Sequence, residues 1–335
     1  MLAWRKSMKD ENLADLPLHK LSEMIRNKEL SSKKLVELYL QRIQKFGNIS
    51  GINAYITVAG NAAIKRAEQL DGLAKQNKFV GPLHGLPIAV KDNINTQDIK
   101  TTGGSQILKS WTPPQDAHVI NKLKEAGAII LGKTNMHEFA FGITTNNLHY
   151  GPCRNPYDLS LISGGSSGGS GAAVAAPFCA GALGTDTGGS VRIPAALCGV
   201  VGVKPTLGRV GRGGMMYLSS TRDVIGPITR TVKDSALMLE VISGFNSRDF
   251  GSSKKMVPNY ISQLNKGLKG KKFGVPKKYF FEDLHPDVLK TINESLKTVK
   301  NLGAELKEVE VKHMDIATPT GFNIVFAESI YLIED

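Results

Sequence analysis

Two glycine–serine segments follow one another near the middle of the chain, and each is flanked by small or apolar residues. The first is SGGSSGGSGAAVAA (163–176) and the second is GTDTGGSVRIPAALCG (184–199). A third segment, GLPIAVKDN (85–93), places Lys91 at the end of an apolar run. Serines in tight glycine turns, together with a lysine that leaves an apolar segment, are the side chains required for acyl transfer without histidine.

Lys91 is the candidate base of this constellation. A lysine side chain titrates near ~10.4 in water, and its pKa must fall toward about 7–8 before it can take a proton from serine at neutral pH. Burial lowers the pKa, because a low-dielectric setting disfavours the ammonium form. The apolar residues Ile88, Ala89 and Val90 precede Lys91 and predict such burial, although a lysine considered alone is usually a surface residue.

Ser190 is the candidate nucleophile, and Ser166 is the candidate proton relay. Ser190 follows Gly188 and Gly189, which lack side chains and so let backbone amides converge on one point, as stabilisation of an oxyanion requires. Ser166 lies in the other glycine-rich segment and would fit between Ser190 and Lys91. Taken alone, serines in glycine–serine runs most often mark flexible turns, so the combination with Lys91 is what favours catalysis.

The segments that must position these residues alternate between helical and strand patterns. Residues 13–80 have helical periodicity, with Ser31 or Ser32 as a candidate cap. Further helices are expected around Val119–Leu123 and after Pro286. The expected strands are the short apolar runs 86–90, 128–131 and 306–311. This alternation predicts an α/β fold with a largely buried sheet.

A polar, turn-rich stretch, NSRDFGSSKK (246–255), is the best candidate for an internal boundary. From Phe322 to Asp335 the sequence is apolar, as a helix or a strand, and no cap or polar tail closes it, so we expect a chain that is incomplete at its C-terminus. We expect one domain (1–335) with an N-terminal helical part (13–80), a catalytic core (81–245) and a C-terminal αβ part (256–335).

Two shorter motifs suggest other kinds of protein. GAIILGKT (127–134) has the spacing of a phosphate-binding loop, but its apolar spacer residues favour a strand. GGSSG (164–168) matches the nucleophile elbow of an α/β-hydrolase, which needs a later histidine. The later histidines are His285 and His313, and their polar surroundings do not indicate a buried base.

The composition excludes several classes of protein. Of 335 residues, 41% are hydrophobic and 21% charged, which is ordinary for a globular chain. The three cysteines (Cys153, Cys179 and Cys198) form no CxxC pair, which argues against a zinc ribbon or a disulfide framework and favours a reducing compartment. No histidine spacing suggests a metal site, so we expect no metal and no cofactor. The net charge of +12 comes from scattered lysines, which indicate a solvated basic surface rather than a nucleic-acid patch.

We expect a cytoplasmic protein with no membrane contact. No segment approaches the ~20 apolar residues of a membrane span. The N-terminal stretch MLAWRKSMKDEN (1–12) contains no apolar run long enough for a signal peptide.

Taken together, GLPIAVKDN, GGSSGGSGAAVAA and GTDTGGSVRIPAALCGVVGVKPT resemble the amidase signature family. The motifs occur in the family's order and spacing, and the similarity runs from near Leu16 through at least Ile242. The resemblance implies a hydrolase of carboxamides that works through a Ser–cis-Ser–Lys triad and an acyl-enzyme. It also implies a mixed sheet covered by helices on both faces. Family members normally continue past the point where this sequence ends.

The resemblance implies a role for each matching residue. Ser190 would be the acylated nucleophile, Ser166 would follow a cis peptide bond and bridge to Lys91, and Lys91 would be the neutral base that later returns a proton to leaving ammonia. The side chains that would brace these loops are Ser167, Asp186 and Arg192. The amides that would form the oxyanion hole are those of Thr187, Gly188, Gly189 and Ser190.

Three functions stay open within this resemblance. The first is a free-standing amidase acting on a small-molecule amide, as a monomer or a homodimer, since RIPAALCG and SSTRDVIGPITRTV are similar to general and aryl-acetamide amidases. The second is the A subunit of the tRNA-dependent amidotransferase, which liberates ammonia from glutamine in a complex with partner subunits and tRNA; its pattern favours glutamine where this chain has Ile193. The third is a non-catalytic or fragmentary member.

Overall fold

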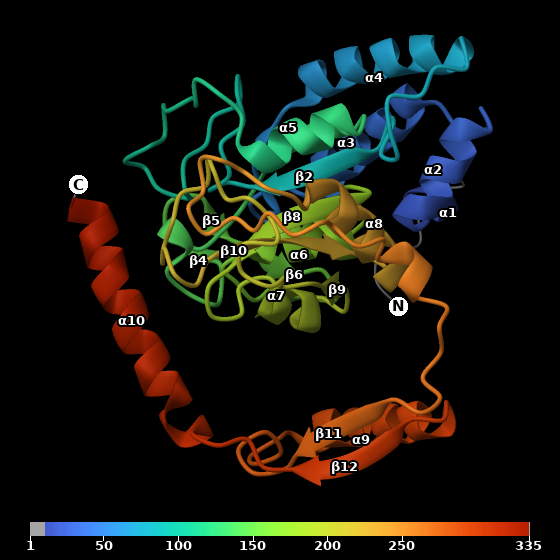
Figure 1. Cartoon of the computed structure of the whole chain (residues 1–335). Coiled ribbons are helices and arrows are strands. Elements are labelled where there is room, and N and C mark those ends of the chain that lie inside the picture. The colour runs from blue at the N-terminus through green and yellow to red at the C-terminus, as the bar shows by residue number, and fades with distance from the viewer. Residues whose placement is uncertain (1–10, 335) are drawn as a thin grey trace. The chain divides into compact units, whose positions relative to one another are not determined.

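The computed structural model describes residues 11–334 and divides the chain after Tyr260 into two compact units (Figure 1). The predicted boundary at 246–255 lies shortly before this division. Residues 1–10 and 335 lie outside the described part, and with them most of the stretch that bears on the signal-peptide prediction. Within residues 11–334, no helix is both long and apolar enough to cross a bilayer.

The first unit is built around a six-stranded mixed sheet with the strand order β1-β3-β2-β8-β10-β9. The central pairings, β3 with β2 and β2 with β8, are parallel, and the outer pairings are antiparallel. The strands of this sheet are β1 (Tyr55–Val58), β2 (Pro87–Lys91), β3 (Ile129–Thr134), β8 (Gly181–Asp186), β9 (Val201–Gly202) and β10 (Val224–Thr229).

Both faces of this sheet are covered. Every residue of β2, β3, β8 and β10 is buried, so side chains on the two faces alike pack under other elements. Helix α6 (Gly168–Ala175) packs across β2, β3, β8 and β10, whereas α4 packs on β3 and α8 on β10. The approach of α6 is so close that a Cβ on Gly169 would lie 2.4 Å from the Asn135 carbonyl oxygen. The prediction of an α/β fold with a mixed, mostly buried sheet is confirmed.

Helices of the first unit surround this sheet in Figure 1. They are α1 (Glu11–Ala14), α2 (Leu18–Arg26), α3 (Ser32–Phe46), α4 (Gly60–Lys75), α5 (His118–Glu125), α6, α7 (Arg192–Leu197) and α8 (Val232–Ile242), with a 3-10 turn, η2, at Glu138–Ala140. Four short strands form two hairpins: β4 (Asn146–Asn147) with β5 (Gly151–Pro152), and β6 (Arg154–Asn155) with β7 (Asp158–Ile162).

The prediction of helix throughout residues 13–80 is wrong at one place. Strand β1 lies between α3 and α4 and pairs with β3 along the edge of the sheet. Its four residues, YITV, are too few to show an alternating pattern between long helical segments. The cap of α3 is Ser31, whose hydroxyl accepts a hydrogen bond from the Lys34 amide at 3.1 Å.

The second unit contains a parallel strand pair joined by a helix. Helix α9 begins at Pro286, as predicted, and the strand that follows it is also confirmed. The apolar stretch after Phe322 is helical. The elements of this unit are η3 (Ile261–Gln263), β11 (Lys272–Pro276), α9 (Pro286–Asn301), β12 (Glu305–Val309) and α10 (Met314–Glu334).

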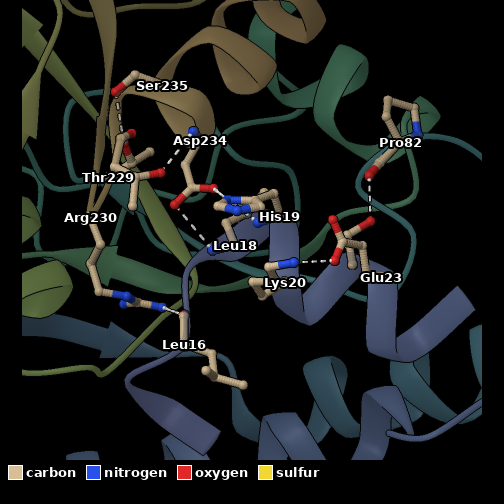
Figure 2. Close-up of polar contacts among 12 residues, drawn as sticks. Leu16, Leu18, His19, Lys20, Glu23, Pro82, Thr229, Arg230, Asp234 and Ser235 are labelled. Atoms are coloured by element: carbon tan, nitrogen blue, oxygen red, sulfur yellow. Dashed lines mark hydrogen bonds and ion pairs between the residues drawn. The ribbon is translucent and has the colours of Figure 1, made fainter. Parts of the chain in front are cut away.

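A buried carboxylate anchors α2 to α8 (Figure 2). The carboxylate of Asp234 accepts hydrogen bonds from the Leu18 amide at 3.1 Å and the His19 amide at 2.9 Å, and it lies 2.7 Å from His19 Nδ1. The first amides of a helix have no partner within the helix, and Pro17, which precedes α2, provides no side-chain cap. Asp234 therefore caps α2 from 216 positions away in the sequence.

Replacing Asp234 with alanine should lower the free energy of unfolding by about 2 kcal/mol, because the variant leaves buried amides unpaired and removes a helix cap. Chemical denaturation followed by circular dichroism measures this change. Glu23→Ala is the matched control, since Glu23 lies on the same helix and its carboxylate forms an exposed ion pair with Lys20; its unfolding midpoint should not move. Equal stability of Asp234→Ala and the parent would contradict the anchoring role.

Candidate active site

Lys91 and Ser166 meet at the end of strand β2. The Lys91 side chain is completely buried, and its Nζ donates hydrogen bonds to Ser166 Oγ at 2.7 Å and to Thr185 Oγ1 at 2.7 Å. Lys91 is the last residue of β2, and Thr185 lies near the end of β8. Since β2 and β8 are adjacent and parallel, their carboxyl ends meet at one edge of the sheet. The sheet itself therefore positions the lysine.

The surroundings of Lys91 make it a base near neutral pH. Burial lowers the pKa of Lys91 to about 7, and the nearby carboxylates of Asp223 and Asp186 oppose this fall. Near pH 7 a large fraction of the amine is then neutral. A neutral Nζ at this distance can take the proton of Ser166 Oγ.

Ser166 is held through its backbone. The Gly165–Ser166 peptide bond is cis, and the Ser166 carbonyl accepts hydrogen bonds from the His137 amide at 3.1 Å and from Thr145 Oγ1 at 3.4 Å. A Cβ on Gly165 would lie 2.7 Å from Thr145 Oγ1 and 2.8 Å from its nitrogen. Only glycine therefore fits immediately before Ser166.

Ser190 lies beside Ser166 because Ser167 joins the two glycine–serine segments. The Ser167 amide donates to the Ser190 carbonyl at 3.2 Å, and the Ser167 hydroxyl donates to the Thr185 carbonyl at 3.1 Å. The Ser190 side chain is 6% exposed, and its hydroxyl has no hydrogen-bond partner in residues 11–334. Among Ser166, Ser167 and Ser190, it is the one side-chain hydroxyl without a hydrogen bond to the described residues.

An ion pair fixes the turn that precedes Ser190. The Asp186 side chain is buried, and its oxygens accept from the guanidinium of Arg192 at 2.9 and 3.0 Å and from the Gly189 and Val191 amides at 2.8 and 3.1 Å. Burial alone would raise the pKa of Asp186, but these bonds and the Arg192 charge outweigh it and hold that pKa below its usual value. Asp186 and Arg192 therefore brace the turn.

Three of the four amides predicted to face an oxyanion are unpaired. The Gly189 amide donates to Asp186, whereas the amides of Thr187, Gly188 and Ser190 donate to no group in the described part of the chain. A Cβ on Gly188 would meet nothing within 4 Å. The turn thus carries backbone donors that have no acceptor in the described residues, and there is open space at Gly188.

The sequence reasoning missed Thr185, which is a polar partner of Lys91, and Asn93, which is a partner of Thr185. Thr185 accepts from both Lys91 and Asn93, whose Nδ2 lies 3.2 Å from Thr185 Oγ1 and 3.3 Å from the Met216 carbonyl oxygen. Asn93 follows Lys91 by two positions, and Thr185 precedes Thr187 by two. Both residues lie within two positions of a residue that the motifs had singled out, whereas nothing in the sequence pointed to Met216.

The competing motifs fold as structural elements. The segment GAIILGKT contains β3, every residue of which is buried, so the prediction of a strand in place of a phosphate-binding loop is confirmed. His285 is the N-cap of α9 and accepts from the Asp287 amide at 3.3 Å. All three cysteines are buried. Within the described residues, no cluster of three or more His, Cys, Asp or Glu side chains could hold a metal ion.

Comparison with known proteins gives the same family across nearly the whole chain. Residues 34–334 match the family model described as Amidase. Over 315 residues the chain is 45% identical to the A subunit of glutamyl-tRNA(Gln) amidotransferase from Geobacter sp. (strain M21), a match that covers 94% of this chain and 64% of that relative. The chain therefore spans less than two thirds of the length of this curated relative.

Two solved structures are similar in fold. The A subunit of glutamyl-tRNA(Gln) amidotransferase from Thermotoga maritima is 38% identical with a TM-score of 0.82, covering 99% of this chain and 67% of its own. The native peptide amidase from Stenotrophomonas maltophilia is 33% identical with a TM-score of 0.86, covering 93% and 66%. With the matched motifs and the arrangement of Lys91, Ser166 and Ser190, these similarities show that the chain belongs to the amidase signature family.

Proposed function

We propose that this chain hydrolyses a carboxamide with Ser190 as nucleophile and with Ser166 and Lys91 as its proton-transfer partners. The observation that carries the proposal is the 2.7 Å hydrogen bond between Ser166 Oγ and the fully buried Nζ of Lys91. A buried lysine held against a serine, next to a second serine with an open hydroxyl, supplies a base, a relay and a nucleophile.

The proposed reaction begins with the neutral amine of Lys91. It takes the proton of Ser166 Oγ as Ser166 takes that of Ser190, and the Ser190 oxygen bonds to the carbonyl carbon of the amide. The developing oxyanion accepts hydrogen bonds from the unpaired amides of Thr187, Gly188 and Ser190. When the C–N bond breaks, the proton returns through Ser166 to the leaving nitrogen, and ammonia departs. Water then cleaves the acyl ester by the same proton path and yields the carboxylate.

For the substrate we propose glutamine, with the chain acting as the A subunit of an amidotransferase. The support is the similarity at 45% identity to a relative of that name, and the Thermotoga maritima protein of the same name, which matches 99% of this chain. This function requires partner subunits and tRNA to receive the ammonia.

A free-standing amidase is the second candidate, and Ile193 favours it. The Ile193 side chain packs against the nucleophile turn, since a Cβ on Gly189 would lie 2.7 Å from its Cδ1. The amidotransferase pattern favours glutamine at this place. The similarity to a peptide amidase agrees with a small-molecule amide as substrate.

Ammonia release from a panel of amides separates the two candidates. The panel contains glutamine, aliphatic amides and aryl-acetamides, each tested with and without the other subunits of a glutamyl-tRNA(Gln) amidotransferase. Release from glutamine that rises when those subunits are added supports the amidotransferase function. Release from another amide by the chain alone supports the free-standing amidase, and failure with every amide in both settings contradicts hydrolysis.

Ser190→Ala should reduce ammonia release by at least about a thousandfold, because the variant has no nucleophile. Its unfolding midpoint should stay within the error of the parent, as one small hydroxyl without a hydrogen bond is lost. Ser160→Ala is the matched control, since Ser160 lies on the exposed strand β7 and its loss should leave the rate unchanged. Comparable activity in Ser190→Ala and the parent would remove Ser190 from the reaction.

The rate of hydrolysis should rise with pH through a midpoint near 7. The sign follows from the base: Lys91 acts when neutral, its pKa is lowered to about 7, and the neutral fraction therefore grows as the pH rises through that value. A pH profile of kcat/KM measures the midpoint. Lys91→Arg is the control, because a guanidinium stays protonated; it should be inactive at every pH up to 9. A flat parental profile from pH 5.5 to 9 would show that another group is the base.

A further inference from the structure

Asp223 is a buried carboxylate at the site that takes no part in the proposed proton path. It is 2% exposed and immediately precedes β10. In the antiparallel ladder between β10 and β8, Val224 pairs with Asp186. The next position of that register therefore places Asp223 across from Thr187.

Asp223 ties the nucleophile turn to the connection between β9 and β10. Its Oδ1 accepts a hydrogen bond from the Thr187 hydroxyl, and its Oδ2 accepts from the amides of Leu218 at 2.7 Å and Ser219 at 3.0 Å. Thr187 carries one of the amides that the turn presents beside Ser190. Fixing its hydroxyl fixes the orientation of the residue and hence the direction of that amide.

The negative charge of Asp223 is balanced less by nearby positive groups than the charge of Asp186, the other carboxylate near Lys91. Lys91 is faced by the two carboxylates of Asp223 and Asp186 and by the half-buried imidazole of His137. Asp186 is already paired with the Arg192 guanidinium. The donors to the Asp223 carboxylate, in contrast, are neutral groups: one hydroxyl and two backbone amides.

The groups that surround Asp223 do not cancel this charge. Arg212 donates to the backbone carbonyl of Asp223 at 3.2 Å, but its guanidinium forms an ion pair with Asp249 at 2.8 Å. The other neighbour is Tyr217, and burial raises the pKa of its phenol, so it is neutral in the working range. Burial raises the pKa of Asp223, whereas its hydrogen bonds and the positive charge of Lys91 oppose that rise and favour the carboxylate. In this charged form Asp223 is the carboxylate near Lys91 that has no arginine partner on its side chain.

We infer that Asp223 is a positioning residue with two effects: it orients Thr187 in the oxyanion turn, and its charge sets the pH at which Lys91 becomes a base. The inference rests on the proposed function of Ser190, Ser166 and Lys91. Asp223 itself touches no reacting atom.

Two variants separate these effects. Asp223→Asn removes the charge, and because a negative charge stabilises the ammonium, the midpoint of the pH profile should fall by about one pH unit. Thr187→Val removes the hydroxyl but keeps the Asp223 charge, so the limiting rate should fall about tenfold with an unchanged midpoint. Asp116→Asn is the matched control, as Asp116 is also buried but does not face Lys91; its midpoint should not move.

The measurement is the rate at which a fluorophosphonate reacts with Ser190 between pH 5 and 9, followed by mass spectrometry of the intact protein. This reagent reports the state of the base without any knowledge of the substrate. Labelling that is lost in Ser190→Ala is labelling of Ser190. Thermal unfolding identifies variants that do not fold. If Asp223→Asn does not fold, Asp223→Ser makes the same charge test, since its hydroxyl oxygen can still accept from a backbone amide.

The outcomes distinguish the two proposals. A lower midpoint in the Asp223 variant, with unmoved midpoints in Thr187→Val and Asp116→Asn, supports the inference. If the labelling rate of the parent has a midpoint near pH 7, and this midpoint does not move when the Asp223 charge is removed, the inferred role of Asp223 is wrong. The proposed roles of Ser190, Ser166 and Lys91 are then unaffected. Absence of labelling at Ser190 in the folded parent overturns the proposed function, and the inference falls with it.

Discussion

The arrangement of the first unit depends on the burial of one amine. Lys91 loses its hydration completely, and a fall of its pKa from 10.5 to about 7 corresponds to about 5 kcal/mol of bias against the ammonium. The sign of the linked stability follows from this direction. The unfolded chain binds more protons between these two values, so the destabilisation is fully present below about pH 7 and declines as the pH rises toward 10.5. The rest of the sheet must be stable enough to hold this residue in place.

That requirement explains the density of small residues around the amine. The strands on either side of Lys91 are buried on both faces, and α6 seals the sheet with glycine, alanine and serine. Small side chains let backbone amides and carbonyls come close enough to partner the serine hydroxyls. Ser167 shows this plainly, because its hydroxyl bonds both the amide and the carbonyl of Thr185 while its own amide holds Ser190. The polar groups of Ser167 are satisfied locally, and the Ser190 hydroxyl is left for chemistry.

Features formed by residues close together in the sequence are predicted better than contacts between residues that are far apart in it. The strand that carries Lys91, the cap of α3 at Ser31 and the helix that starts at Pro286 all follow from short patterns and are present. Strand β1 was missed, since its four residues become a strand only by pairing with β3. At the site, Lys91 and the serines could be chosen from their types and glycine surroundings. Asp223 could not, because its closeness to Thr187 arises from the register between two strands that are far apart in the chain.

The close packing of α6 and of the residues before it also limits the positions at which a substitution could alter substrate choice. At Gly169 and Gly165 even a single methyl group would collide with backbone atoms, so these positions admit no new side chain. Gly165 therefore keeps the backbone before Ser166 free of a side chain, and Gly169 keeps α6 close to the backbone of Asn135. Alterations of what fits beside Ser190 would come from Ile193 and from the connections that reach the site from outside the sheet, among them the segment with His137 and the one with Met216. Adaptation to another amide would consequently proceed by remodelling loops, while the strand ends that carry Lys91 and Thr185 stay as they are.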